Sequence, residues 1–495
     1  MNRFQNKPKI TTSLLSITVF LFIVLFGIIT AAFGKAEVSG MIVLIYVIII
    51  CYYSLFTKIK RSTNYSSILC DSRFYVFTTI LMYSILPPIY CILTLEENGG
   101  ARVRTAYNAT IYTADELFKT LIMSTLLFLG ITLGFFLRER TKGYDIKVDD
   151  DSNEIDDKVG RKFFGWLIVC IISTLLFYIP FIRGGFRVIQ LGGSILDVDR
   201  TISSGVLGNL QEIFFSADLM TASTVAMLYY AYKLNIGQRS RRILLIVTVL
   251  LQTIGALLTT RRARALSIIL CVFVIYVYWY EKRKRKLPWT QIIVAASAVG
   301  FLYLLEVFMG QRQTNGGIAS YIRLFDGISA YDSLLRSTRE LPAASMLSNI
   351  IYGLFRPVPI FGKYIIEFFG MPTDAAPLYH WMAERYATYQ IGGGLAYTPQ
   401  LEAYLCLGYF GCFLFGIIYG FAFGKKRSGL MNLFVIAMAF SIARGTIQVV
   451  LKLVWTFWVF GFCFYDQLLF SRVSFGTKTR RINNSVGSGD TYVKG

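Results

Sequence analysis

The sequence predicts an all-α polytopic integral membrane protein, and its composition carries most of that prediction. Of the 495 residues, 55% are hydrophobic and only 16% are charged, whereas an ordinary soluble domain carries about 25% charged residues. The mean hydropathy of +0.54 excludes soluble enzymes, disordered chains and fibrous repeats. The apolar stretches run continuously instead of alternating, which excludes an outer-membrane β-barrel.

About twelve apolar stretches are long enough to cross a membrane, which takes about 20 residues. An even number of spans places both termini on the same side of the membrane. The predicted spans are centred in the windows 12–33, 38–56, 74–94, 116–137, 163–182, 204–232, 243–260, 264–280, 290–309, 401–423, 429–446 and 449–470.

Basic residues predict the orientation of these spans, because Lys and Arg favour cytoplasmic loops. With the N-terminus inside, 31 of the 50 Lys and Arg residues fall in inner segments, which predicts an N-in, C-in protein. One of these segments, residues 138–162, is also acidic and is predicted to be a solvated cytoplasmic linker. The topology accounts for the net charge of +21, so we expect no nucleic-acid partner. The inner segments are the start of the chain, 57–73, 138–162, 233–242, 281–289, 424–428 and the tail after residue 470.

One outer segment, residues 310–400, is too long for a simple connection and divides the chain into parts. Residues 1–309 hold spans one to nine, residues 401–470 hold spans ten to twelve, and residues 471–495 form a basic cytoplasmic tail. Apolar residues at helical spacing within the long loop predict amphipathic helices, one of them ending before Pro357. We expect this loop to fold and to lie on the outer membrane surface.

Three clustered arginines, Arg261, Arg262 and Arg264 in "LLTTRRARALSIIL", stand between the seventh and eighth predicted spans. The predicted topology puts them in a short outer turn, against the positive-inside bias. Guanidinium groups match phosphate oxygens bidentately, which predicts a pyrophosphate site at the outer headgroup level. Arg312 and Arg356 are predicted to assist. The alternatives are binding of ordinary anionic lipid, or a hairpin of spans seven and eight entered from inside.

Several residues near the predicted outer surface are candidates for acid–base chemistry. Glu402 stands at the outer mouth of the tenth span, where an ionisable group is costly and often functional; the alternative is a carboxylate that snorkels to the interface. His380 and Glu384 are four residues apart and share a helix face. This spacing suits a base oriented by a carboxylate, but it is also common in surface pairs. Asp326 and Asp332 are further candidates.

Small and charged residues within the spans are predicted to shape the helix bundle. Gly408 and Gly411 are expected to let helices approach closely. Glu212, Asp218 and Lys452 are intramembrane charges that either pair structurally or line a cavity. The eight cysteines lack CxxC spacing and there is one histidine. Neither a disulfide framework nor a zinc site is supported, and we expect no metal or other cofactor.

In its layout and in two short motifs, the chain resembles the Wzy-type O-antigen polymerases, the repeat-unit polymerases of bacterial surface polysaccharide synthesis. The shared features are about twelve spans with one long, late outer loop, the arginine-bearing turn "LTTRRARAL" and the stretch "TPQLEAYLCLGYFG". In that stretch Glu402 precedes Gly408 by six residues, as in the family's acid-then-glycine run. The related O-antigen ligases carry a histidine just before the comparable run, where this chain has Tyr397, Thr398 and Pro399, which argues against a ligase.

The resemblance implies inverting, metal-independent glycosyl transfer on the periplasmic face of a bacterial inner membrane. The growing glycan would leave its undecaprenyl pyrophosphate and join the next lipid-linked repeat unit, with a chain-length regulator as a further candidate partner. On this hypothesis the five arginines contact pyrophosphate, and Glu402 is the leading catalytic carboxylate, with His380 and Asp326 behind it. The alternatives are a flippase of lipid-linked oligosaccharide, for which two related halves would be expected, and an O-antigen ligase.

Overall fold

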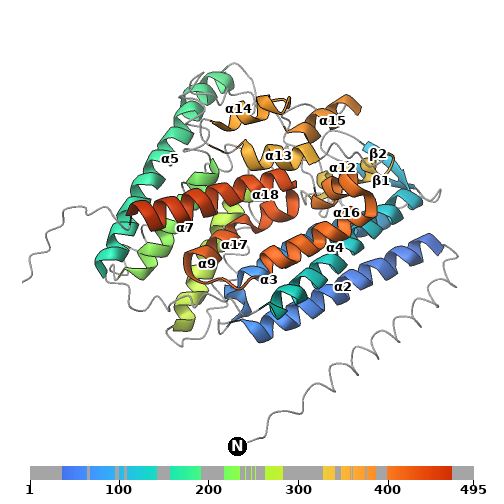
Figure 1. Cartoon of the computed structure of the whole chain (residues 1–495), viewed down its shortest axis with the longest axis horizontal. Helices are drawn as coiled ribbons and strands as arrows, with labels where there is room; N and C mark the ends of the chain where they lie inside the picture. The colour runs from blue at the N-terminus through green and yellow to red at the C-terminus, as the bar shows by residue number, and fades with distance from the viewer. Residues whose placement is uncertain are drawn as a thin grey trace, which may run out of the picture.

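The computed structural model is mostly helical, which confirms the helical part of the predicted class (Figure 1). Of the predicted spans, 12–33 and 290–309 lie outside the described residues, as does nearly all of 243–260. The structure describes residues 36–63, 67–94, 100–104, 109–141, 156–190, 217–234, 240, 243, 247, 251, 262–282, 327–340, 347–356, 358, 361–373, 376–385 and 398–470.

Five helices in the described part of the chain are long and apolar enough to cross a membrane: α2, α3, α4, α16, and α18 with its π-helical continuation η6. Two shorter apolar stretches lie in α9 and α17. The count of twelve spans and their orientation stay predictions. The bounds are α2 Ala36–Ser62, α3 Ser72–Leu93, α4 Ala114–Arg140, α5 Asp156–Gln190, α7 Ala217–Lys233, α9 Arg262–Lys282, α16 Pro399–Phe423, α17 Gly429–Arg444, α18 Ile447–Val454 and η6 Trp455–Leu469, with a short 3-10 turn η1 at Ile68–Cys70.

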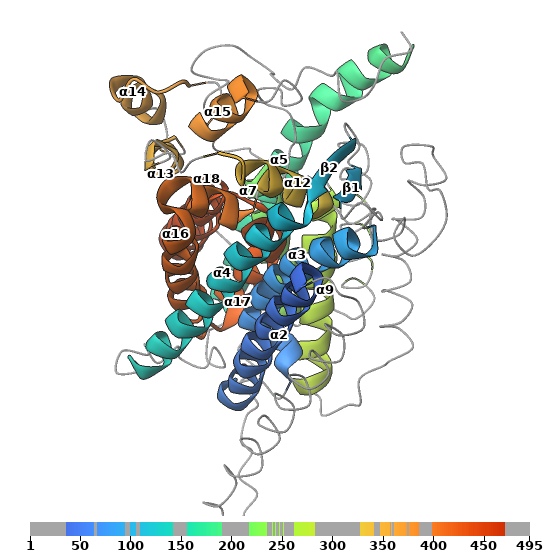
Figure 2. The same ribbon diagram turned by 90° about the vertical axis from the view of Figure 1, so that its right-hand side faces the viewer.

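Four short helices from the long predicted loop form a layer over one end of the bundle (Figure 2). They are α12 Gly327–Ser337, α13 Leu347–Phe355, α14 Phe361–Phe368 and α15 Pro377–Arg385. The apolar spacing in the sequence predicts helices here but not α14. An antiparallel hairpin of β1 Gly100–Arg104 and β2 Ala109–Thr113 is an addition to the all-α prediction, and it pairs Gly100 with Thr113.

The hairpin and the long loop are joined by charged contacts at the start of α4. A capping box formed by Thr113 and Glu116 begins this helix. The Tyr112 hydroxyl donates to Asp332 Oδ1 of α12 at 2.6 Å, and Arg336 Nε donates to Oδ2 of the same carboxylate at 3.1 Å. Arg339 forms an ion pair with Glu116. Two segments that are far apart in sequence, both predicted to be outer, are thereby fixed to each other.

Glycines allow α4 and α16 to pack with their backbones in contact. A Cβ at Gly130 or Gly134 of α4 would overlap the carbonyl oxygens of Phe413 and Ile417. On α16, a Cβ at Gly416 would overlap the carbonyl oxygen of Leu127, and Gly420 is equally crowded by α4. The residue numbers of the contacting pairs increase together along α4 and α16, so the two helices run parallel. This is a small-xxx-small interface, in which close approach yields van der Waals contact that lipid cannot supply.

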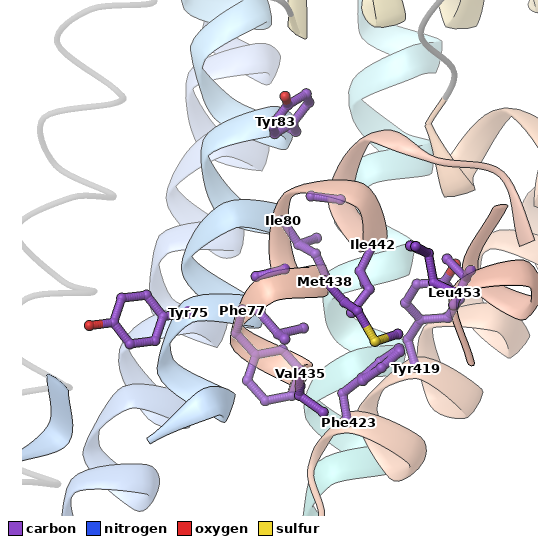
Figure 3. Close-up of a cluster of buried hydrophobic side chains, with 14 of the residues drawn as sticks. Tyr75, Phe77, Ile80, Tyr83, Tyr419, Phe423, Val435, Met438, Ile442 and Leu453 are labelled. Atoms are coloured by element: carbon purple, nitrogen blue, oxygen red, sulfur yellow. The ribbon is translucent and has the colours of Figure 1, made fainter. Parts of the chain in front are cut away.

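The central core lies between α3, α16 and α17 (Figure 3). Phe77 and Ile80 of α3 point toward α17, and Met438 of α17 lies among the rings and aliphatic groups of α16 and α18. These side chains are almost completely buried. The core holds the end of α17 in place, and α17 leads directly into α18.

At the end opposite the loop helices, charged and polar groups tie four helix termini together. The fully buried Arg73 at the start of α3 forms an ion pair with Asp71 at 2.6 Å. Arg73 Nη1 also contacts Ser62 Oγ at the end of α2 and Glu139 near the end of α4. Asn432 of α17 donates to the Cys70 carbonyl oxygen. Segments predicted to be cytoplasmic therefore meet at one end; its assignment to the cytoplasm stays a prediction.

Candidate functional site

A break in α16 separates two helical turns from the rest of the span. Gly408 has φ +63 and ψ −148, and Leu407 is also non-helical. Few residues other than glycine adopt this backbone region. A Cβ at Gly411 would overlap the carbonyl oxygen of Ala403 within the same helix. The close approach predicted at these glycines therefore occurs within α16: Gly411 lets the two helical segments approach, and Gly408 makes the turn between them.

The short segment before this break carries Glu402, whose side chain is fully buried. Its Oε1 accepts a hydrogen bond from Asn349 Nδ2 of α13 at 2.9 Å. Its Oε2 accepts from the backbone N–H of Ile447, the first residue of α18. The alternative of a carboxylate snorkelling to the interface is excluded by this burial. The positive end of the α18 dipole also faces the carboxylate.

Asn349 is held in position by a close contact between α13 and α18. Gly353 lies one turn after Asn349, and a Cβ there would stand 2.7 Å from Gln448 Cα. Asn349 Oδ1 also accepts a hydrogen bond from the Leu378 N–H of α15 at 3.2 Å. The amide therefore bridges Glu402 to the start of α15. Three helix N-termini, of α15, α16 and α18, converge on one carboxylate–amide pair.

Tyr379 and Arg444 lie beside this pair. Burial raises the pKa of Tyr379 to about 12; Arg444 opposes the shift, while Glu402 and Tyr352 add to it. Tyr379 is therefore a neutral hydrogen-bonding group at neutral pH. Arg444 ends α17, three residues before the N–H that binds Glu402, and brings a positive charge to the site.

Several buried polar atoms near Glu402 have no hydrogen-bond partner among the described residues. Thr398 and Thr446 precede α16 and α18, yet neither side chain caps its helix. Both hydroxyls are buried and without a partner, as is Oε1 of Gln400. N-terminal threonines ordinarily accept a bond from their own helix. The surroundings of Glu402 thus hold hydroxyl and amide groups able to bind a polar ligand.

The predicted pyrophosphate arginines are only partly placed. Arg262 and Arg264 lie in the first turn of α9. Arg356 follows the last residue of α13 and donates its N–H to the Tyr352 carbonyl oxygen. Arg261 and Arg312 lie outside the described residues.

Contacts along α7 indicate the end of the bundle at which α9 begins. Tyr232, near the end of α7, contacts Tyr278, near the end of α9, with ring centroids 5.8 Å apart. The two helices therefore run parallel, and the first turn of α9 lies at the end where α7 starts. There Asp218 pairs with Lys452 of α18 at 3.8 Å. Of the two alternatives for these charges, structural pairing or lining of a cavity, Asp218 and Lys452 show the pairing. Glu212 lies outside the described residues.

The other acid–base candidates are less central than Glu402. His380 is half-buried on α15, next to Tyr379, and Glu384 is exposed on the same helix. Asp326, immediately before α12, lies outside the described residues. Sequence reasoning missed Asn349, although its placement among the apolar residues of a predicted amphipathic helix was a signal that could have found it.

The model of one family, described as O-antigen polysaccharide polymerase Wzy, matches residues 14–472. No curated protein and no solved structure matches the chain.

Proposed function

This chain belongs to the O-antigen polysaccharide polymerase family Wzy, and we propose that Glu402 is the catalytic carboxylate of its polymerisation reaction. Members of this family join lipid-linked oligosaccharide repeat units in membranes, and this chain is accordingly a multi-pass membrane protein. The observation that carries the proposal is the buried carboxylate held by Asn349 and the Ile447 N–H. A charged group at such a site is costly unless it is paired or used.

In the proposed reaction, a hydroxyl of the acceptor repeat unit attacks the anomeric carbon of the growing glycan. A new glycosidic bond forms as the bond between that carbon and the pyrophosphate oxygen breaks. The pyrophosphate leaves with the electron pair, and Glu402 takes the hydroxyl proton as general base. A single displacement of this kind inverts the anomeric configuration. General bases contribute about 10²–10⁴-fold to a rate.

The hydrogen bonds of Glu402 fit the role of a base that must be oriented. Each carboxylate oxygen accepts one bond from the protein and keeps a second lone pair for a substrate hydroxyl. The hydroxyls of Thr398 and Thr446, which have no partner among the described residues, are suited to hold sugar hydroxyls. His380 stays the second candidate on α15, and Asp326 the third.

The leaving pyrophosphate requires stabilisation of its developing negative charge. We assign this to Arg262 and Arg264 at the start of α9, with Arg261 beside them and with Arg312 and Arg356 assisting. Arginine forks bind phosphate oxygens bidentately, so this route is independent of a metal. The active site would face the periplasm, and the donor and acceptor would both be linked to undecaprenyl pyrophosphate.

Complementation of a deletion strain tests the assignment of Glu402. Wild type, Glu402→Gln and Glu384→Gln are compared on a gel of surface polysaccharide, with protein amount and thermal midpoint measured in detergent. We expect a ladder for wild type and for Glu384→Gln, whose carboxylate is exposed on α15. A folded Glu402→Gln protein should give no ladder and should leave the lipopolysaccharide core capped by one repeat unit.

Other outcomes of this experiment contradict the proposal. A full ladder from Glu402→Gln shows that the carboxylate only joins helices. If the lipopolysaccharide core of the deletion strain carries no repeat unit at all, the missing protein acts as a flippase or a ligase. An Arg262→Ala, Arg264→Ala double variant should also lose the ladder, whereas Arg61→Ala at the opposite end should keep it. An unchanged polymer length and yield in the double variant removes the pyrophosphate assignment.

A further inference from the structure

Helix α14 presents three different sides, although it has only eight residues. Gly362 and Ile366 are buried. Lys363 and Glu367 form an i,i+4 pair with 3.7 Å between Nζ and Oε1. A third side carries large aromatic residues at i, i+3 and i+7 spacing, which places them on one helix face. These are Phe361, Tyr364 and Phe368.

The buried side of α14 is fixed to its neighbours. A Cβ at Gly362 would stand 2.5 Å from the Phe355 carbonyl oxygen. Ile366 packs with Tyr352 of α13 and Ala376 before α15 in a small separate core. The rings of Phe355 and Phe369 stack with centroids 6.3 Å apart. Helix α14 is therefore part of one unit with α13 and α15, and its orientation is set by this packing.

The aromatic side faces outward from this unit. Phe361 is 65% exposed, Tyr364 63% and Phe368 86%. Water is a poor solvent for three such rings on one face, and a patch of this kind marks a contact surface. Lipid is the partner best supported, because aromatic side chains concentrate at membrane interfaces. A short helix with an apolar face and a charged side suits that boundary.

The position of α14 agrees with a lipid contact. Figure 2 shows α14 above α13 and α16, at the same edge of the molecule. Helix α16 exposes Phe410 to 65% and Leu407 to 52%, as expected for a span that contacts lipid. Helix α14 therefore lies over the same edge of the molecule as α16, which is long and apolar enough to cross a membrane.

We propose that α14 is an interfacial helix that inserts Phe361, Tyr364 and Phe368 into the headgroup and acyl boundary of the outer leaflet. The helix anchors the α13–α15 unit to the membrane. Since α13 carries Asn349, this anchoring holds the Asn349 amide against Glu402. That last consequence rests on the proposed function, whereas insertion of the aromatic side does not.

Spin labelling of the full chain in phosphatidylethanolamine and phosphatidylglycerol vesicles tests the insertion. Single cysteines replace Phe361 or Phe368, and matched controls replace Lys363 or Glu367, which are 46% and 47% exposed. The exposed Cys463 and half-buried Cys406 are changed to Ser beforehand. Power saturation then compares collisions with oxygen, which concentrates in lipid, and with a polar nickel chelate, which stays in water.

We expect labels at 361 and 368 to collide mainly with oxygen, and labels at 363 and 367 mainly with nickel. Frequent nickel collisions at 361 and 368 would place the aromatic side in water and overturn the proposal. Low collision rates with both reagents would mean that protein covers this face, which also overturns it. The readout needs no polymerase activity, so it fails or succeeds independently of the role of Glu402.

Discussion

Asn349 Nδ2 and Glu402 Oε1 are 2.9 Å apart, although the two residues are separated by 53 positions and belong to different helices. The amide comes from a short helix of the long loop, and the carboxylate comes from the first turns of a membrane span. Because Asn349 also accepts a bond from the N–H of Leu378, one side chain couples α13, α15 and α16. The loop is thus part of the candidate site.

Replacement of Asn349 is expected to lower polymerisation in a graded order. Asn349→Ala leaves two buried partners unsatisfied, at about 1–3 kcal/mol for each. Asn349→Asp is expected to be worse, because two carboxylates then face each other. Polymer yield should fall from wild type to Ala to Asp at equal protein amounts on the polysaccharide gel. An Asp variant with normal yield would contradict the coupling.

Gly408→Ala is expected to abolish the polymer ladder. Its backbone at φ +63 and ψ −148 strains any other residue by about 1–3 kcal/mol, and relief of that strain moves Glu402. Gly370, at φ +66 with no atom within 4 Å of the place a Cβ would occupy, supplies the control. Gly370→Asn should keep the ladder, since Asn tolerates positive φ. Equal phenotypes for the two variants would show that the break in α16 is dispensable.

Gly130→Ala is expected to destabilise the protein, because its Cβ would overlap the Phe413 carbonyl oxygen. Overpacking of this kind costs about 1–3 kcal/mol. The matched control is Gly160→Ala in α5, where the nearest atom is Leu234 Cδ2 at 3.9 Å. That change should be neutral or stabilise by about 0.5–1 kcal/mol. Thermal unfolding in detergent measures both, and equal midpoints would contradict the packing of α4 on α16.

Tyr379 predicts a loss of stability at alkaline pH. Its pKa is about 12 in the folded protein, against about 10 in an unfolded chain. The folded state keeps the proton over this interval while the unfolded state releases it. The contribution of Tyr379 to the free energy of unfolding is therefore complete below a pH of about 10 and is lost as the pH rises through about 12. Thermal midpoints should fall more steeply with pH over this window for wild type than for Tyr379→Phe. Identical slopes for the two proteins would contradict a raised pKa of Tyr379.

The sequence by itself determined the helical membrane class, because continuous apolar stretches of this length are stable in a membrane only as helices, which satisfy their own backbone hydrogen bonds. It also singled out Glu402, through the cost of a carboxylate at the edge of a span, and the Gly408 motif that follows it. Amphipathic spacing indicated helices in the long loop, since periodicity is a local property of the chain.

Only the tertiary structure decided which groups meet. The partners of Glu402 are 53 and 45 residues away, and no local pattern encodes such a pairing. The same holds for the pairing of Asp218 with Lys452 and of Tyr112 with Asp332. Gly408 was visible as a small residue, but its positive φ depends on how α16 folds back against its own first turns. Local sequence sets the helices, whereas the contacts that make a site arise from how the helices pack.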